Sequence, residues 1–266
     1  MNKVFSHFTH IPNDDYAFRD LNKVDSQTLE KLSKEGIVFG SFNSADDGWW
    51  LVGREAPTPK ENEVTASVPY MQGNYDFSIL NGQRYFENRT LTYKLTLFDS
   101  DYHYRMAMEE NLKRELMPIG KQRLYDTHAP GYYWEAKCIS VQVEDDEEKG
   151  TATATVEFEA YPFAYTSHNE GDDIWDDVEF DHWIWQYVSF SVNGDQQVII
   201  NNIGSRPVES HFEVTGNIKV AGGFGSLDLN HDISKDTTLI LDTGKNTFNL
   251  SGNGSIKFVF RREEMI

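Results

Sequence analysis

The densest group of side chains that could do chemistry is an acidic run between residues 170 and 182. It contains Asp172, Asp173, Asp176, Asp177, Glu179 and Asp181, with His168 and His182 at its edges. Oxygen ligands at this density suit Ca²⁺, but the spacing of an EF-hand loop, with its fixed glycine and terminal glutamate, is absent. Acids on a solvated linker, or facing a basic partner, are commoner than a calcium site. We therefore predict no metal site here.

A glycosidase or a sugar-binding surface is the next chemistry to consider. Glycoside hydrolysis needs two carboxyl groups roughly 5–10 Å apart, one of them with a raised pKa. The chain has 43 acidic residues, and their spacing singles out no such pair. Among six tryptophans, Trp183 and Trp185 share one face of an apparent strand and are the best pair for stacking on a sugar. Core or subunit packing is the commoner role for such residues.

Other catalytic signatures are missing from the sequence. Gly225-Ser226 lacks the frame of a nucleophile elbow, and the eight histidines form no H-E-x-x-H motif. Cys138 occupies the interior of an apparent strand, where a small buried thiol is expected. The glycines from Gly222 to Gly225 predict a turn, because no Lys-Ser/Thr and no helix follow them. We predict no catalytic residue, no cofactor and no metal.

The composition of the chain argues against several classes of protein and of binding partner. The 266 residues carry a formal net charge of −19, which argues against direct nucleic-acid binding and against docking on anionic lipid. The single cysteine excludes an intramolecular disulfide framework. No apolar run approaches the roughly 18 residues of a spanning helix, and the first residues show no continuous apolar signal region. We expect no membrane association.

The clearest element that would position any site is a strand over residues 90–97. Its apolar side chains alternate with polar ones and are Leu91, Tyr93, Leu95 and Leu97. Such alternation is typical of a strand with one face in a core. A second β-rich run covers residues 75–80, and Asn81-Gly82 between the runs favours a two-residue turn. The pattern predicts a long hairpin formed by these two runs.

One helix is predicted from about residue 102 to 117, with Ser100 or Asp101 as its N-cap. Its apolar stripe consists of Tyr104, Met108, Leu112 and Leu116. Residues 132–143 and 151–160 predict a further hairpin, joined by the charged connection 145–150. A single helix among many strands should cover a sheet face or edge.

The chain is predicted to be mainly β and to have four segments. They are an N-terminal arm with a short helix (1–35), a β-sandwich-like domain (36–165), an acidic linker or hairpin (166–186) and a C-terminal β-sandwich (187–266). Shorter strands are expected at 37–42, 49–52, 63–68, 187–192, 198–201, 210–214, 218–220, 238–241 and 255–261. Gly222-Gly223 and Gly252-Asn253-Gly254 are expected to be turns between strands.

Several of these turn and strand motifs resemble one known family. They are Gly40-Ser-Phe42, Asp47-Gly48, the Pro57/Pro59 loop leading to Val68-Pro69, Gly73-Asn-Tyr-Asp-Phe-Ser78, Tyr85, Arg89-Thr-Leu-Thr-Tyr93 and Phe158-Glu-Ala-Tyr-Pro-Phe-Ala-Tyr165. From about Gly36 to the C-terminus the chain resembles the distal tail protein (Dit) family of long-tailed bacteriophages. The motifs concern strands and turns, not catalysis.

The resemblance implies a structural protein of the virion, assembled in the host cytoplasm and located at the distal end of the tail. Six copies would form a ring that lets DNA pass. Its partners would be the tail tube protein, a tail-associated hub or lysin protein, and a receptor-binding or baseplate protein. The second domain would be galectin-like or similar to a carbohydrate-binding module, although the cluster expected of a sugar-binding galectin is not recreated. The expected subunit-interface residues are Tyr75, Phe77, Tyr85 and Arg89.

Two other interpretations remain open from the residues alone. The first is a stand-alone carbohydrate-binding module that uses the aromatic-rich second half, with Trp183 and Trp185 as sugar contacts. The second is a glycoside hydrolase built on a β-sandwich. Both would work without a ring.

Overall fold

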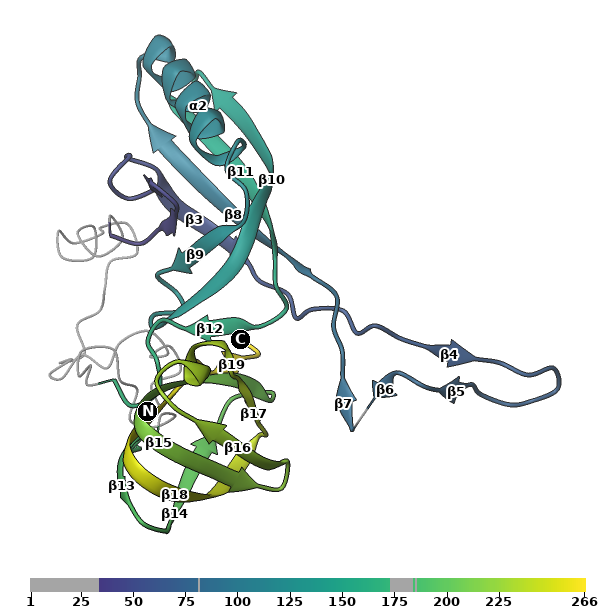
Figure 1. The fold of residues 1–266 in the computed structure, drawn as a ribbon. Coiled ribbons are helices and arrows are strands. Elements are labelled where there is room, and N and C mark those ends of the chain that lie inside the picture. Colours follow the sequence, from purple (N-terminus) through teal and green to yellow (C-terminus); the bar gives the residue numbers. More distant parts are fainter. Residues whose placement is uncertain (1–33, 81, 173–183, 185) are drawn as a thin grey trace, which may run out of the picture.

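A computed structural model describes residues 34–80, 82–172, 184 and 186–266 of the chain (Figure 1). Its fold is mainly β, as the sequence predicts, with two large antiparallel sheets, two hydrophobic cores and a long protruding arm. The predicted N-terminal helix, most of the acidic run, and both Trp183 and Trp185 lie outside the described residues.

The first sheet has nine strands, and its main path runs in the order β2-β1-β9-β10-β11-β8-β3. These strands are β1 (Ile37–Phe39), β2 (Phe42–Asn43), β3 (Trp50–Glu55), β8 (Arg89–Phe98), β9 (Gln122–Asp126), β10 (Tyr132–Asp146) and β11 (Thr151–Ala160). Two short strands complete the sheet: β12 (Ala164–Thr166) pairs with β10, and β19 (Glu263–Glu264) pairs with β12. The last strand of the chain therefore joins the sheet of its first half.

Alternating side chains account for the first core. In β8, Leu91, Tyr93 and Leu95 are fully buried, and the facing strand β11 buries Ala154, Val156 and Phe158. These residues pack with Phe39 and Trp134 in one continuous cluster. The β10–β11 hairpin was predicted correctly, including its turn at Gly150.

The predicted helix is α2 (Tyr102–Leu116), and Asp101 is its N-cap. A carboxylate oxygen of Asp101 accepts a hydrogen bond from the His103 N–H at 2.9 Å. One part of the predicted stripe is wrong, because Tyr104 is 45 % exposed and Arg105 takes the buried position instead. The Arg105 guanidinium pairs with Asp145 on β10 at 2.6 Å, which anchors the helix to the sheet. No helix in the described ranges is long and apolar enough to span a membrane.

Residues 56–88 leave the sheet between β3 and β8 and form the arm (Figure 1). It contains two small hairpins, one formed by β4 (Thr65–Ala66) with β5 (Tyr75–Asp76) and one by β6 (Ile79–Leu80) with β7 (Gln83–Arg84). The expected pairing of residues 75–80 with the strand at 90–97 is wrong, because β8 pairs with β3 and β11. Leu80 of β6 pairs with Gln83 of β7, so the connection predicted at residues 81–82 joins these two strands; Asn81 itself lies outside the described residues.

The second sheet has six strands around the second core. They are β13 (Ser189–Asn193), β14 (Gln196–Asn202), β15 (Val208–Gly222), β16 (Gly225–Leu229), β17 (Leu239–Leu241) and β18 (Gly244–Val259), with a short 3₁₀ helix η1 (Ile233–Asp236). The long strands β15 and β18 pair with each other, and each also holds two shorter strands.

Two sequence predictions fail in the second sheet. Residues 210–214 and 218–220 belong to the single strand β15, and Gly252-Asn253-Gly254 lies inside β18 and is not a turn. The glycines allow β15 and β18 to pair at very close approach. A Cβ atom added at Gly254 would lie 1.9 Å from the Thr215 carbonyl oxygen, so only glycine fits.

Candidate functional site

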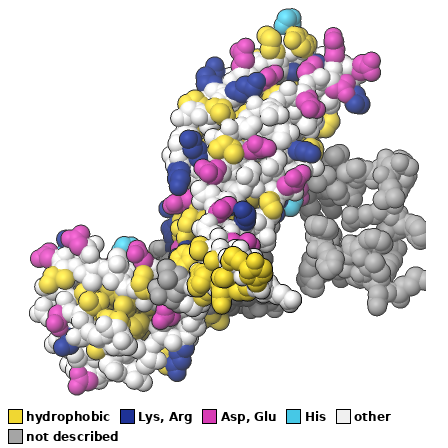
Figure 2. Space-filling model, turned by 90° about the vertical axis from the view of Figure 1, so that its right-hand side faces the viewer, with side chains coloured by type: hydrophobic (Ala, Val, Ile, Leu, Met, Phe, Trp, Pro, Cys, Tyr) yellow, Lys and Arg dark blue, Asp and Glu magenta, His cyan; other side chains and the backbone are white. Residues whose placement is uncertain are grey.

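The arm carries three of the four residues that were predicted to contact a neighbouring subunit, and all three are exposed. Tyr75 is 54 % exposed, Phe77 is 61 % exposed, and Tyr85 is 39 % exposed. Other exposed apolar side chains of the arm are Val64, Val68, Tyr70 and Ile79. Figure 2, which looks toward the tip of the arm, shows hydrophobic side chains gathered there.

The end of the arm has an unusual composition. No residue from Val64 to Tyr75 is charged, whereas a quarter of the whole chain is. Hairpins as short as β4–β5 and β6–β7 are marginally stable alone in water. Exposed apolar surface of this kind marks an interaction site in a folded protein. The arm therefore has the properties of a surface that a partner covers.

Arg89 lies at the root of the arm and does not share its exposed surface. Its side chain is 3 % exposed. One guanidinium nitrogen donates to the Ala56 carbonyl oxygen at 2.8 Å, where the arm begins, and another donates to the Ile266 main-chain oxygen at 2.6 Å. These bonds lie within one chain, and the expected contact of Arg89 with a neighbouring subunit stays a prediction.

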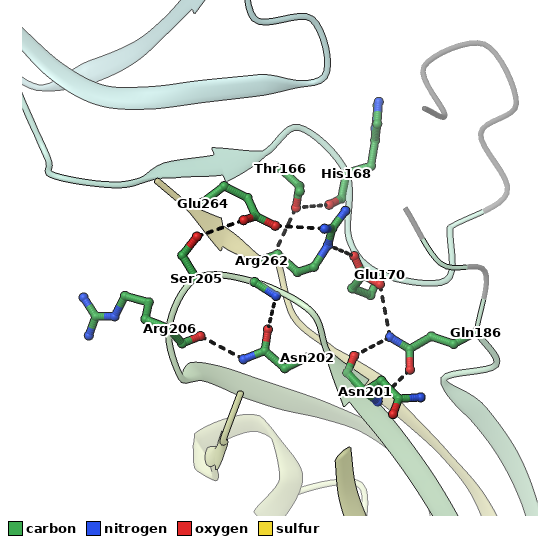
Figure 3. A network of polar contacts seen from close by, with 11 residues as sticks. Thr166, His168, Glu170, Gln186, Asn201, Asn202, Ser205, Arg206, Arg262 and Glu264 are labelled. Carbon is green, nitrogen blue, oxygen red and sulfur yellow. Dashed lines mark hydrogen bonds and ion pairs between the residues drawn. The ribbon is translucent and has the colours of Figure 1, made fainter. Parts of the chain in front are cut away.

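A buried ionic network joins the two halves of the molecule, and Figure 3 shows it from close by. Arg262, between β18 and β19, donates to Glu170 at 2.5 Å and to Glu264 at 2.9 Å. The side chain of Arg262 is 3 % exposed and that of Glu170 is 8 % exposed. Gln186 links this network to the second sheet, because its amide donates to Glu170 at 3.1 Å and to the Asn201 carbonyl oxygen at 2.6 Å.

The segment from residue 261 to residue 266 acts as a strap over this junction. Glu263 and Glu264 form β19 on the first sheet, while the Ser205 N–H from the second half donates to the Glu263 carbonyl oxygen at 2.8 Å. The Glu263 carboxylate accepts a hydrogen bond from Tyr161 at 3.1 Å and faces Arg206 at 3.4 Å. Burial raises the pKa of Glu263, an effect that Arg206 and Tyr161 partly oppose.

Arg206 lines two separate hollows. The larger, of about 720 Å³, lies between the root of the arm and the second sheet, and it is lined by residues that include Tyr85, Phe86, Phe163 and Thr243. The smaller, of about 540 Å³, lies between Tyr133 and Tyr165 of the first sheet and Val208 and Ile240 of the second.

The described residues offer little for covalent chemistry. No group of three or more His, Cys, Asp or Glu side chains among them is placed to hold a metal ion. Cys138 is 1 % exposed, and burial raises the pKa of its thiol to about 11, which disfavours the reactive thiolate. His128 faces the buried Asp126 at 3.4 Å, but Asp126 also pairs with Arg54 and accepts a hydrogen bond from Tyr93, so it serves the core.

Comparisons with known proteins identify the fold. No protein-family model matches the chain, and no curated protein matches it. Among solved structures it is similar to the Dit protein (gp 19.1) of phage SPP1, described as a paradigm of the hub adsorption apparatus in phages that infect Gram-positive bacteria. That match has a TM-score of 0.61 at 10 % identity and covers 86 % of this chain and 98 % of the other.

A second match is to a chain of the phage p2 baseplate in its activated conformation with strontium, with a TM-score of 0.40 at 10 % identity over 85 % of this chain and 97 % of the other. The SPP1 match confirms that this chain has the fold of the distal tail proteins whose motifs it resembles.

Proposed function

We propose that the protein is a structural component of the distal tail of a long-tailed phage, in which six copies close into a ring. The observation that carries the proposal is the arm, whose uncharged end (residues 64–75) and exposed apolar side chains lie on a fold similar to that of a phage hub protein. A head-to-tail contact between identical copies gives a closed ring when its rotation closes. The apolar end of the arm would lie on the neighbouring copy, where it leaves water.

The edges of the first sheet support the same arrangement. Its path ends at β2 on one side and at β3 on the other, and Val52 on β3 is 57 % exposed. Unpaired strand edges invite pairing with another chain unless they are protected. In the proposed ring, the next copy covers them.

The proposed position in the virion also defines the partners. One face of the ring would bind the tail tube protein, and the other would bind a tail-associated hub or lysin protein and a receptor-binding or baseplate protein. The net charge of −19 suits a channel that DNA crosses without sticking, because like charges repel. The protein would act as a scaffold and not as an enzyme.

Native mass spectrometry and negative-stain microscopy of the purified protein test the ring. We expect hexamers with a central hole, and we expect the double variant Tyr75→Ser/Phe77→Ser to remain monomeric with unchanged thermal stability. Ile240→Ser, which removes an apolar side chain that is 53 % exposed on the second sheet, is the control and should still assemble. A double variant that assembles as well as the control would contradict the role of the arm.

The alternative of a stand-alone carbohydrate-binding module predicts a monomer that binds cell-wall sugars. Its proposed contacts, Trp183 and Trp185, lie outside the described residues. A glycan array on the same preparations distinguishes it from the ring: sugar binding by a protein that remains monomeric at every concentration would favour the module.

A further inference from the structure

The end of the arm contains a turn whose backbone conformation is unfavourable for the residue that adopts it. In the loop of the β4–β5 hairpin, the Met71 N–H donates to the Val68 carbonyl oxygen at 3.1 Å. Pro69 and Tyr70 are the two central residues of this turn, and Tyr70 has a φ of +70°. Proline first and a positive φ second are typical of a type II turn, whose second central position normally holds glycine or asparagine. Among the described residues, Tyr70 is the only one other than glycine with a positive φ.

The side chain of Tyr70 is fully exposed, so nothing within one copy covers its ring. Glycine at this position would form the same turn without strain. Strained positions of this kind cluster at functional contacts, where the surrounding structure holds them. Tyrosine is also one of the side chains that most often dominate the binding energy of an interface. The turn therefore presents the ring of Tyr70 to a partner.

The larger hollow, at the root of the arm, has the lining that a tyrosine side chain requires. Phe86 and Phe163 belong to its apolar wall, and their rings meet edge to face with centres 5.7 Å apart. Asn88 and Thr243 add polar groups to the same lining. A tyrosine has an apolar ring and a hydroxyl group at its tip, which finds a polar partner when it is buried. The volume of about 720 Å³ lies within the range of about 300–1,000 Å³ for pockets that enclose drug-sized ligands, so a tyrosine side chain and its neighbours have room there.

The charges of this hollow favour an uncharged occupant. The Arg84 Nε donates to the Glu61 carboxylate at 2.7 Å, and Arg206 faces Glu263 at 3.4 Å, so both cations of the lining are already paired. Asp242, the remaining charged residue of the lining, is exposed to water. A charged segment would lose hydration in this hollow without gaining a free partner for its charge. The uncharged end of the arm does not carry that cost.

The end of an arm that fills this hollow must come from a second copy. Figure 1 shows the end of the arm directed away from the body of the chain, whereas the hollow lies at the root of the arm against the second sheet. Residues 56–70 can span up to about 50 Å when extended, which exceeds the roughly 30 Å diameter of a small domain. An apolar group and a complementary pocket on different surfaces of one chain produce a head-to-tail contact between copies.

We propose that Tyr70 anchors the arm in the larger hollow of a neighbouring copy. The inference rests on the assembly proposed above and names its contact. The ring of Tyr70 lies against the apolar wall formed by Phe86 and Phe163 of the neighbour, and its hydroxyl group meets the polar part of the lining. The strain of the turn is then offset by a contact that exists only between copies.

Disulfide trapping between co-expressed cysteine variants of the full chain tests the proposal. Gln72→Cys places a thiol two residues from Tyr70, and Thr243→Cys places one in the exposed part of the lining, while the native Cys138 is 1 % exposed. We expect mild oxidation to link the two copies. The matched control pairs Gln72→Cys with Ser226→Cys, an exposed position on β16 outside the hollow, and should give at least tenfold less linked product.

Two changes at the anchor, each added to the Gln72→Cys chain, distinguish docking of the ring from mere proximity. Tyr70→Ser should lower the yield of linked product at least tenfold, because an anchor side chain carries much of the binding energy, whereas Tyr70→Phe should keep most of the yield. Since Tyr70 is fully exposed, neither change should alter the thermal stability of a single copy. Equal yields at the hollow and at the control position, or no effect of Tyr70→Ser, would overturn the proposal.

Native mass spectrometry of the same samples keeps the anchor and the ring apart. Hexamers that lack the expected link would overturn the anchor and leave the ring. A link in samples without hexamers would support the anchor and contradict the ring, and the absence of both would overturn both.

Discussion

At the scale of single residues, glycines determine how closely the two longest strands of the second sheet approach. A Cβ atom at Gly254 would meet the Thr215 carbonyl oxygen at 1.9 Å, and one at Gly252 would meet the Asn217 carbonyl oxygen at 2.2 Å. Both glycines also have positive φ angles, +150° and +124°. Neither the clash nor the backbone conformation can be relieved without separating β15 from β18.

We therefore expect Gly254→Ala to lower the free energy of unfolding by at least about 2 kcal/mol, from steric clash and backbone strain. Chemical denaturation followed by circular dichroism measures the loss. Gly223→Ala is the control, because a Cβ atom there would have no neighbour within 4 Å, and its stability should stay close to that of the native chain. Equal stability of the two variants would show that the strands can move apart at no cost.

Single residues also show where sequence reasoning ends. The alternation of apolar and polar residues correctly identified the buried faces of β8 and β11, because every second side chain of a strand points to the same face of the sheet. The pattern of apolar residues could not identify Arg105 as buried, because an arginine is counted as polar and is therefore assigned to the exposed face of the helix. Nor could it distinguish the glycines inside β18 from those of a turn, because the close approach depends on a strand distant in sequence.

At the scale of elements, β19 has an electrostatic cost that changes with pH. Burial raises the pKa of Glu263 above the value of about 4.5 expected in the unfolded chain. A carboxyl group with a raised pKa adds stability while it is protonated in both states, at pH below about 4.5. That contribution is lost as the pH rises through the pKa of the folded state.

Comparison of the native chain with Glu263→Gln isolates this effect, because glutamine does not titrate. We expect the stability of the native chain relative to the variant to fall as the pH is raised from 4 to 7. Thermal unfolding across this range measures the difference. Ser255→Ala, which removes a hydroxyl group bonded to Thr215 on the second sheet and to no titratable group, is the control and should differ from the native chain by a constant amount. A difference for Glu263→Gln that also stays constant would contradict the raised pKa.

The arm shows what local patterns can establish about an element. The position of the short connection after Leu80 could be predicted, because turn chemistry depends on adjacent residues, whereas the aromatic residues of the arm were expected only from the family resemblance. The partner of the strand after the arm could not be, since strand pairing depends on contacts far apart in sequence. Residues 75–80 therefore looked like the partner of β8, whereas that place in the sheet belongs to β3 and β11.

At the scale of the whole molecule, contacts at the junction join the two cores. They could not be predicted from the sequence, because Arg262, Glu170 and Glu264 are of types that usually lie on the surface, and only the folded chain brings them together. The same holds for the smaller hollow at the junction, whose lining residues range from 123 to 263. Sites of this kind follow from tertiary structure and leave no local motif.

The strap and its arginine also determine whether the molecule unfolds as one unit. Each half has its own core, so in the absence of strong contacts between them they could unfold separately. Arg262 is buried between Glu170 and Glu264, and its removal leaves carboxylates without their cation in a dry site. Breaking a buried pair from one side costs about 3–5 kcal/mol.

We therefore expect the native chain to unfold in one calorimetric transition and Arg262→Leu to unfold in two, with the second core melting separately from the first. Lys257→Gln is the control, because it removes a half-buried pair with Asp172 at 3.5 Å, away from Arg262, and should keep the single transition. Hydrogen exchange would assign each transition to β8–β11 or to β15–β18. If Arg262→Leu still unfolds in one transition, the coupling between the halves must come from the remaining contacts of the strap, such as the β12–β19 pairing and the bond from Arg89 to Ile266.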